Sequence, residues 1–542
     1  MSSSTEIVTP GPRPCCLERL NYDILEIIYG YLRPARGLRP LALTSRWVRA
    51  SCKPVLFRRA IVRPDLVTEE HFLPSYLWLY VHSLTFAGRW VYPTPPRSYY
   101  RPISLSNVLP RIPHLSRVSI RDGAEDGVPW LAIDEILALP CLRVFEVQGT
   151  LNYWNRRPDD QSHQALASPP PPLTTYRHSL RDFRERPRRL PSDADTIACV
   201  VSYGHVQQSL EYLTLASEVA PVATLGAVCW PRLKVLSLRG EMENTKNLIR
   251  LFEHMPALEE LSLQLARATG TGSALVFCPA EWSGQFPWPR LRRLVVSYPD
   301  PDDLLYPLLA SASALQCLDL RCWPRHYIHL SLDDRIHMTQ LRWRSPILKS
   351  SELLRLLSQC RSHSLSELAI EYTEDEEDLE LLRHIPLFFP NLEILFVHRY
   401  RKSGNENVPI RAIGQALASS SRLRVVYAHL DLYGTPEPWV NLYNRRSDKL
   451  AHHLRSLVES ARELAQVLGT SVQAVCLLHR EVHLNIWAPF RIVRTDDSVD
   501  ASPEAPSDAV YIGDLELIAR DEPGPPHTYR EWGVDPRTAR IP

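Results

Sequence analysis

The chain has 542 residues, of which 44% are hydrophobic and 23% are charged. This length exceeds one ordinary domain unless the chain is an elongated repeat array, and the composition is typical of a globular protein with a buried core. The 62 Lys and Arg residues nearly balance the 61 Asp and Glu residues, which leaves a net charge of +1. That balance argues against a general nucleic-acid or anionic-membrane binder, so we expect neither as a partner.

The cysteines and the N-terminal segment indicate a reducing compartment. The 11 cysteines are scattered and odd in number. Residues 1–14 lack the basic segment and apolar run of a secretory signal, and no stretch of about 18 apolar residues predicts a membrane span. We therefore expect a cytoplasmic or nuclear protein whose cysteines are small core residues.

Residues 20–32, LNYDILEIIYGYL, predict an amphipathic helix because their apolar side chains recur at steps of three and four. Asn21 can cap the start of this helix, and Pro34 is expected to stop it. A second helical pattern begins at Pro40 and is expected to end at Pro54. Helices this short bury little surface by themselves, so they either cap a larger fold or dock on a partner.

The order of residue types in this segment gives information about the family that helical periodicity alone does not give. An acidic residue and Ile-Leu follow a leading Leu, then come a Leu-rich stretch, Ser-Arg-Trp and a closing Pro-x-Leu-Phe. These positions are Leu20, Asp23, Ile24, Leu25, Ile28, Leu32, Leu38, Leu41, Leu43, Ser45, Arg46, Trp47, Pro54, Leu56 and Phe57. The pattern resembles an F-box and covers about a tenth of the chain, although Asn21 stands where that family usually has proline.

The resemblance implies a trihelical module that docks on the Skp-type adaptor of cullin–RING ubiquitin ligases. The residues implied to bind the adaptor are Leu20, Ile24, Leu25, Ile28, Leu32, Leu41, Leu43, Trp47, Leu56 and Phe57. An apolar stripe at helical spacing suits docking into a groove. Two alternatives stay open, because the helices could simply cap the larger fold and Trp47 could be an internal core residue.

A phrase of the form L-x-x-L-x-L, or a close variant, recurs along the rest of the chain. Its copies lie at residues 80–86, 114–120, 141–147, 209–215, 232–238, 257–263, 290–296, 314–320, 364–370, 391–397 and 422–428. The leading leucines Leu233 and Leu258 are 25 residues apart, and Leu291 and Leu315 are 24 apart. These spacings fall within the period of about 20 to 29 residues that is typical of leucine-rich repeats.

The phrase alternates apolar and polar residues as a half-buried strand does. Helical patterns lie between copies, at residues 244–256, 301–313, 350–360 and 408–420. Strand, loop and helix in repetition predict an α/β solenoid with parallel strands on the concave face and helices on the convex face. It is irregular, similar to the divergent leucine-rich repeats that follow F-boxes in many fungal proteins. Helical HEAT-type repeats are an alternative that the two-residue alternation disfavours.

Polar and aromatic residues at the variable strand positions would face the concave side of such a solenoid. They are Arg239, Gln264, Arg321, Glu371, His398 and Tyr427. We take them as candidate contacts to a protein substrate. The alternative for each is an ordinary solvated residue, because few residues of any interface carry most of its energy.

The expected organisation has four parts. Residues 1–14 are a disordered N-terminus, 15–60 an F-box-like helical module, 61–494 a leucine-rich-repeat-like solenoid, and 495–542 a mostly loose tail. A Pro- and Arg-rich segment at about 155–195 interrupts the repeats, either as a regulatory or docking loop or as a disordered insertion on one repeat.

No motif in the sequence requires catalysis, a metal or another cofactor. The stretch GTGS at 270–273 lacks the glycine and lysine of a phosphate loop. HREVH at 479–483 is not the HExxH motif of zinc proteases, and Cys317, Cys322 and His326 have loose spacing. We therefore expect a non-enzymatic adaptor that selects a substrate for ubiquitination. The alternatives are a repeat scaffold without a ligase role and an enzyme that uses the HREVH region.

Overall fold

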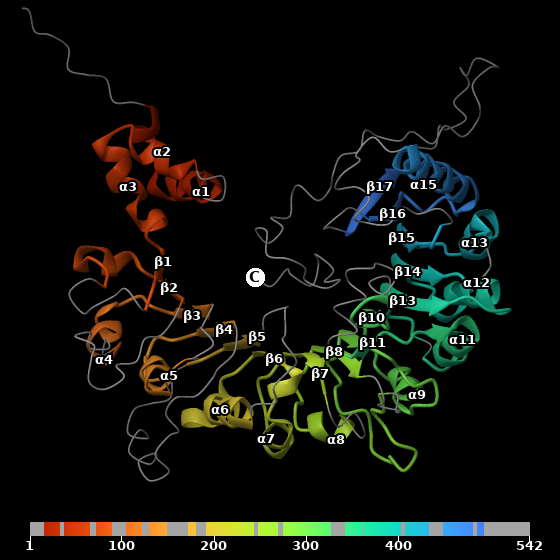
Figure 1. The fold of residues 1–542 in the computed structure, drawn as a ribbon, viewed down its shortest axis with the longest axis horizontal. Helices are drawn as coiled ribbons and strands as arrows, with labels where there is room; N and C mark the ends of the chain where they lie inside the picture. Colours follow the sequence, from red (N-terminus) through yellow and green to blue (C-terminus); the bar gives the residue numbers. More distant parts are fainter. Residues whose placement is uncertain are drawn as a thin grey trace, which may run out of the picture. The chain divides into compact units, whose positions relative to one another are not determined.

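The structure is a computed structural model, and its description covers only part of the chain. The described residues are 16–32, 37–64, 72–88, 105–121, 128, 130–148, 172–179, 191–242, 248–268, 275–326, 342–360, 362–402, 407–432, 448–480 and 485–492. The chain divides into two compact units, Met1–Tyr176 and Arg177–Pro542 (Figure 1). Each unit is described separately below.

The first unit begins with helices. A short 3-10 turn, η1 (Cys16–Arg19), precedes α1 (Tyr22–Leu32), α2 (Leu38–Ala42) and α3 (Arg46–Leu56). Asn21 caps α1, since its side-chain oxygen accepts a hydrogen bond from the Asp23 N–H at 3.4 Å. The three helices enclose a small core of Leu25, Tyr29, Leu38, Ala42, Cys52 and Val55.

The second helical pattern of the sequence is two helices and not one. Residues 43–45 separate α2 from α3, because extended Ser45 caps α3 by accepting a hydrogen bond from the Val48 N–H at 3.0 Å. The expected stop at Pro54 is wrong, since α3 continues to Leu56. Pro54 lies in the last turn, where its missing N–H removes only one helical hydrogen bond.

Four parallel strands follow in the first unit. β1 (Arg59–Val62), β2 (Ser83–Ala87), β3 (Arg117–Arg121) and β4 (Val144–Gln148) pair in chain order. Short helices connect them: η3 (Ser75–Tyr80), α4 (Leu105–Val108), η4 (Leu109–Arg111) and α5 (Trp130–Leu137). A further strand, β5 (Thr175–Ser179), lies inside the segment that the sequence analysis took as an insertion.

The second unit contains a longer parallel array. β6 (Tyr212–Ala216), β7 (Val235–Glu241), β8 (Glu260–Ala268), β9 (Arg293–Val296), β10 (Cys317–Asp319), β13 (Glu367–Thr373), β14 (Ile394–Tyr400), β15 (Val425–His429) and β16 (Ala474–Arg480) pair in this order. β17 (Asn485–Arg491) pairs antiparallel with β16. Two short strands, β11 (Trp343–Arg344) and β12 (Leu348–Lys349), join β8 and β13 respectively.

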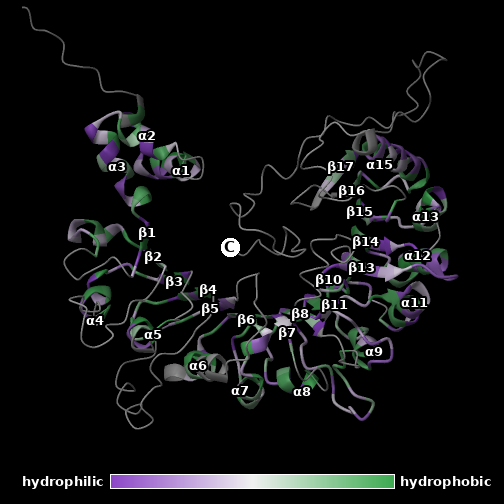
Figure 2. Cartoon of the chain, in the orientation of Figure 1, coloured by the Kyte–Doolittle hydropathy of each residue, from purple (hydrophilic) through white to green (hydrophobic). Residues whose placement is uncertain are grey.

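Helices of the second unit lie along one side of this array (Figure 1). They are α6 (Pro191–Ser202), η6 (Tyr203–Gln208), η7 (Ser217–Val219), α7 (Val222–Ala227), α8 (Leu248–Phe252), α9 (Leu305–Leu309), α11 (Ser350–Gln359), α12 (Asp378–Phe388), α13 (Ile410–Leu417) and α15 (Asp448–Val467). Figure 2 shows hydrophobic residues on the strands and on the helices that cover them. The core of the unit therefore lies between the strands and the helices.

One buried residue of each strand forms a continuous row through that core, which we call the leucine ladder. The strand register aligns Leu213, Leu236, Leu261, Leu294, Leu318, Leu368, Leu395, Val426 and Val475. Each is at most 2% exposed. Burying one such side chain stabilises the fold by about 1.5–3 kcal/mol. A single repeat could not bury its own ladder residue, because the neighbouring repeats cover it.

The predicted α/β repeat architecture is confirmed within the described residues. Every copy of the leucine phrase overlaps a strand, and the helical patterns at 244–256, 301–313, 350–360 and 408–420 contain α8, α9, α11 and α13. The HEAT-type alternative is wrong, because parallel strands carry the repeat. The termini at 1–14 and 495–542 lie outside the described residues.

Gly240 in β7 lies at a position where the array leaves little space for a side chain. It has a φ of 129°, and a Cβ there would overlap the carboxylate of Glu218, which also accepts a hydrogen bond from the Glu241 N–H. We expect Gly240→Ala to lower the free energy of unfolding of the second unit by about 1–3 kcal/mol, because the positive φ strains a residue with a Cβ and the Glu218 carboxylate must move. Urea denaturation followed by circular dichroism measures this.

Gly30 on α1 provides the control, because nothing lies within 4 Å of a Cβ added there. Gly30→Ala is expected to raise the stability of the first unit by up to about 1 kcal/mol. Equal, small effects of the two substitutions would contradict the packing at Gly240.

Candidate functional site

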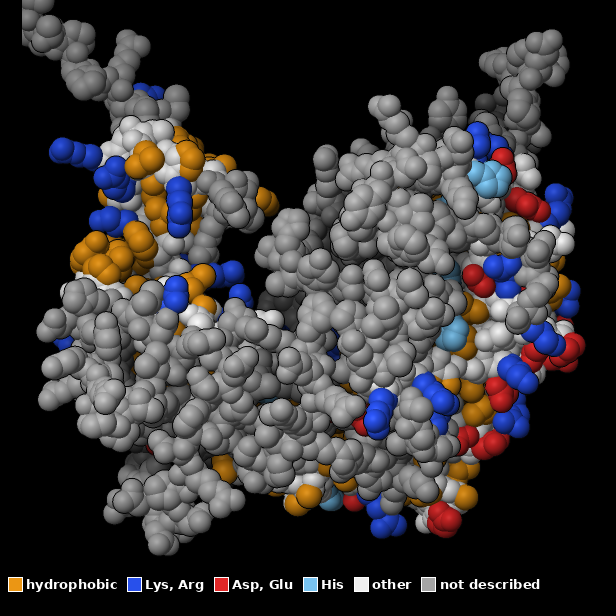
Figure 3. Space-filling view, in the orientation of Figure 1, with side chains coloured by type: hydrophobic (Ala, Val, Ile, Leu, Met, Phe, Trp, Pro, Cys, Tyr) orange, Lys and Arg blue, Asp and Glu red, His pale blue; other side chains and the backbone are white. Residues whose placement is uncertain are grey.

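Exposed large hydrophobic side chains concentrate in the N-terminal helices. Of twelve such side chains in the described residues, eight lie before residue 62. These eight define what we call the N-terminal apolar surface: Tyr22, Ile24, Ile27, Tyr31, Leu43, Trp47, Phe57 and Ile61. Figure 3 shows hydrophobic side chains gathered over α1 to α3. A soluble chain seldom exposes so many large apolar groups together unless they contact a partner.

The packing of α1 explains why one side of it stays exposed. Leu25 and Tyr29 point into the helical core, and the Tyr29 hydroxyl shares a 2.8 Å hydrogen bond with the Ser51 hydroxyl of α3. Ile24, Ile27 and Tyr31 recur at steps of three and four on another side of the helix. Ile27 is 60% exposed and Tyr31 is 81% exposed.

The residues proposed from the F-box resemblance fall into three groups. Ile24, Leu43, Trp47 and Phe57 are exposed, and Leu25 is buried in the helical core. Leu20, Ile28, Leu32, Leu41 and Leu56 are partly buried against that core. Trp47 is 37% exposed and lies outside the core cluster, so it is not an internal core residue.

Sequence reasoning missed part of this surface. Ile27 and Tyr31 belong to the apolar stripe of residues 20–32, but the match to the family pattern did not include them. Their helical spacing relative to Ile24 was the available signal. Ile61 follows the last matching residue and lies on β1.

A second candidate surface is the helix-free face of the second unit, which the variable strand positions form. Of the six residues predicted to contact a substrate, Arg239 and Tyr427 are partly buried. Gln264, Arg321, Glu371 and His398 are buried. The strand register places five of the six on this face, and Arg321 follows the end of β10. Four of the six are buried within the folded chain.

Glu371 holds the segment that follows β10. Its carboxylate accepts hydrogen bonds from the Cys322 N–H at 2.9 Å, the His326 N–H at 2.8 Å and the Tyr400 hydroxyl at 2.8 Å. The Cys322 thiol also lies 3.0 Å from this carboxylate. A carboxylate with this many donors fixes the loop on the face of the sheet.

Arg321 forms a buried ion pair with Asp319. Its Nε donates to Asp319 at 2.9 Å and its Nη2 donates at 2.6 Å, while Arg325 lies 3.9 Å from the same carboxylate. Burial would raise the pKa of Asp319, but the Arg321 guanidinium outweighs it and holds that pKa well below its usual range. The pair therefore stays charged, and Arg321 also lies 5.1 Å from the centre of the Phe396 ring.

Aromatic rings surround His398. Its ring lies edge-on to Trp487 at 5.6 Å and 5.9 Å from His429, while Phe396 stacks on Tyr427 at 4.3 Å. Burial lowers the pKa of His398 well below its ordinary value, and the charge of Arg321 lowers it further. The imidazole is therefore neutral near pH 7.

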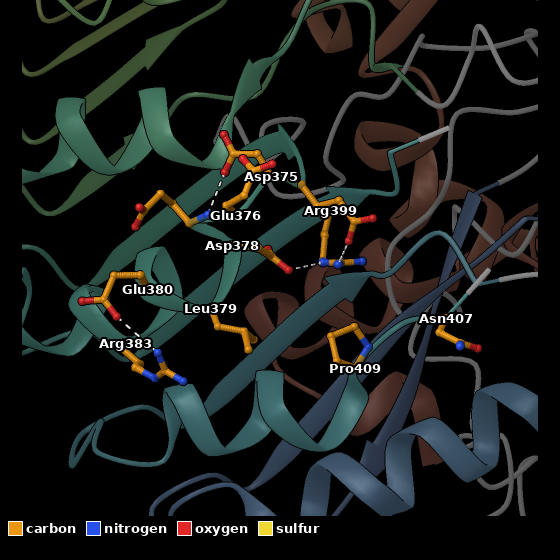
Figure 4. Close-up of a pocket in the computed structure, with 11 residues that line it drawn as sticks. Asp375, Glu376, Asp378, Leu379, Glu380, Arg383, Arg399, Asn407 and Pro409 are labelled. Atoms are coloured by element: carbon orange, nitrogen blue, oxygen red, sulfur yellow. Dashed lines mark hydrogen bonds and ion pairs between the residues drawn. The ribbon is translucent and has the colours of Figure 1, made fainter. Parts of the chain in front are cut away.

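A groove of about 640 Å³ lies at the start of α12 (Figure 4). Glu374 and Asp378 contact the guanidinium of buried Arg399 from two sides. Asp375 accepts hydrogen bonds from the Ser350 and Ser351 hydroxyls, which lowers its pKa against the opposing effect of burial. Asp378 is the first residue of α12, and Glu374 and Asp375 precede the helix.

The described residues hold no group of three or more His, Cys, Asp or Glu side chains suited to a metal ion. Cys322 contacts Glu371, and Cys317 is buried in β10. Of the HREVH motif, residues 481–483 lie outside the described residues. No described helix is both long enough and apolar enough to cross a membrane.

Comparisons with known proteins leave the family open. No family model and no curated protein matches the chain. Among solved structures, one that aligns is the crystal structure of the mouse RP105/MD-1 complex, at 12% sequence identity and a TM-score of 0.28. The alignment covers 64% of this chain and 51% of that one, so it spans about half of the matched chain's length. A likeness this distant supports no argument about function.

Removal of Asp319 tests the buried ion pair. Asp319→Ala leaves Arg321 buried without its counterion, and we expect a loss of about 3–5 kcal/mol in the free energy of unfolding. The double variant Asp319→Leu with Arg321→Met removes both charges and is expected to recover part of that loss. Guanidinium denaturation measures both, and a single variant as stable as the double one would contradict the pairing.

The neutral state of His398 predicts a pH dependence. Below pH 6.5 the unfolded chain binds a proton at this histidine that the folded chain does not bind, so stability falls as pH falls. This contributes up to about 1.4 kcal/mol per pH unit between pH 6.5 and 5. His398→Gln is expected to reduce the slope by that amount, and equal slopes in urea denaturation would contradict a neutral buried imidazole.

Proposed function

We propose that this chain is a non-catalytic substrate-recognition adaptor of a Skp–cullin–F-box type ubiquitin ligase. The helices α1 to α3 dock on the Skp-type adaptor, and the repeat array binds the protein to be modified. The chain itself raises the effective concentration of that protein near the ligase.

The observation that carries the proposal is the N-terminal apolar surface. A small helical unit keeps its own core of Leu25, Tyr29 and Cys52 and still exposes Ile24, Leu43 and Trp47. These exposed residues are also positions of the F-box resemblance. Helix docking into an apolar groove uses such anchors, and aromatic ones commonly carry much of the binding energy.

The repeat array supports the recognition half of the proposal more generally. Parallel strands with helices on one side form an extended face that is rigid and variable in its side chains. A repeat scaffold for protein–protein interaction without a ligase role is the second candidate. It is favoured if the N-terminal apolar surface contacts the array or another protein and not the adaptor.

Charge substitution on the apolar surface tests adaptor docking. We expect Ile24→Glu with Trp47→Glu to weaken binding of purified Skp-type adaptor by about 30-fold or more, because a central anchor contributes about 2 kcal/mol or more. Isothermal titration calorimetry with the full chain measures the affinity, and circular dichroism checks folding.

The matched control places the same charges on exposed apolar residues elsewhere. Leu387 on α12 and Leu454 on α15 are exposed, and Leu387→Glu with Leu454→Glu is expected to leave adaptor binding unchanged. Adaptor binding that survives the Ile24 and Trp47 substitutions would reject the docking assignment and favour the scaffold alternative.

A further inference from the structure

We propose that the groove at the start of α12 binds an extended basic segment of the recruited protein. Six of the eleven residues that line the groove are acidic and two are basic. Its volume of about 640 Å³ lies within the range of about 300–1,000 Å³ that is usual for ligand sites. The inference deepens the proposed function and relies on it only for the fate of the bound protein, because peptide binding is measured without the adaptor.

Three carboxylates of the groove are held by partners within the fold. Glu374 and Asp378 contact the guanidinium of Arg399, and Asp375 accepts hydrogen bonds from two serine hydroxyls of α11. These contacts fix the wall of the groove before any ligand arrives. A ligand therefore meets a preformed surface, which lowers the entropy that binding costs.

One hydrogen-bond donor of this wall has no partner. Arg399 is 1% exposed, and its Nε and Nη2 contact two carboxylates, as the dashed lines in Figure 4 mark. Its buried Nη1 has no hydrogen-bond partner among the described residues. A buried donor without an acceptor is uncommon in folded proteins. The backbone carbonyl of a peptide bound in the groove would supply the acceptor.

Two exposed carboxylates, Glu376 and Glu377, line the same groove. The side chain of Glu376 is 87% exposed and lies 3.9 Å from the exposed ammonium of Lys402, and a contact this long between solvated groups contributes little. Glu377 forms no ion pair with a described residue. This adjacent pair of negative charges attracts a cationic side chain of a partner.

Apolar side chains complete the groove. Leu379 is partly buried and Pro409 is exposed, and both line it. Figure 4 shows them on the same side of the contact between Asp378 and Arg399. Lys and Arg lay their methylene stems on apolar surface while the charged end stays in a polar environment. The groove thus matches a side chain that is apolar along its length and cationic at its end.

These features together favour a basic peptide over other cations. In the part of the chain that the structure describes, no three His, Cys, Asp or Glu side chains are placed to hold a metal ion. A metal ion would also bring neither an apolar stem for Leu379 nor a carbonyl for Arg399, and a polyamine would bring no carbonyl. An extended peptide that contains Lys or Arg brings the carbonyl, the stem and the charge.

Fluorescence anisotropy of the full chain with a labelled peptide of alternating arginine and glycine tests the inference. We expect saturable binding at about 150 mM salt, where long-range attraction between exposed charges is screened. Glu376→Gln with Glu377→Gln is expected to weaken binding by about tenfold or more, because hydrogen bonds between charged groups are lost. The same peptide with citrulline in place of arginine keeps its shape but loses its charge, and it is expected not to bind.

The matched control removes two exposed carboxylates elsewhere in the second unit, by Glu260→Gln with Glu281→Gln. It is expected to leave the affinity for the arginine peptide unchanged. An equal loss in this control, or no loss in the Glu376 and Glu377 variant, would overturn the proposal. Displacement of the peptide by an equal concentration of spermine or Ca²⁺ would also overturn it, because neither supplies the carbonyl that the proposal assigns to Arg399.

Calorimetry with the Skp-type adaptor separates this inference from the proposed function. The Glu376 and Glu377 variant is expected to bind the adaptor as the wild type does, and circular dichroism checks that its second unit is folded. Peptide binding without any adaptor binding would reject the ligase role and leave the basic-segment site standing. Adaptor binding without peptide binding would reject the site and leave the ligase role standing.

Discussion

The leucine ladder is the constraint on which the second unit depends. Each strand contributes one fully buried apolar side chain, and the register of the parallel pairs aligns these residues from Leu213 to Val475. A shift of one residue in any strand would turn its apolar row toward the helix-free face. Because successive residues of a strand point to opposite faces, the ladder also determines which residues lie on the helix-free face.

The helix-free face shows how a repeat array accommodates polar groups. Asp319 and Arg321 are buried as a pair, and Glu371 satisfies backbone groups of the loop after β10. Isolated, each of these charges would be costly to bury. The ion pair and these hydrogen bonds hold residues 320–326 against the strands.

Sequence reasoning located the repeating strands because leucine spacing reports burial directly, and it located α1 from its periodicity. It did not foresee that Gln264, Arg321 and His398 are buried, since variable positions say nothing about which loop covers them. It also joined α2 to α3, because apolar spacing alone does not reveal a cap such as Ser45. The antiparallel pairing of β11 with β8 sets Arg344 opposite Arg267, 77 positions apart, and no local feature of the sequence signals it.

The antiparallel strand β17 has a consequence for how such an array can change in length. Parallel repeats add one strand at a time, each returning through a helix to the same orientation. β17 runs opposite to β16 over its full length, from Arg491 opposite Ala474 to Asn485 opposite Arg480. A repeat duplicated after β17 would have to pair with a strand that runs in the opposite direction. Repeats can therefore be duplicated or deleted within the parallel array only ahead of β16.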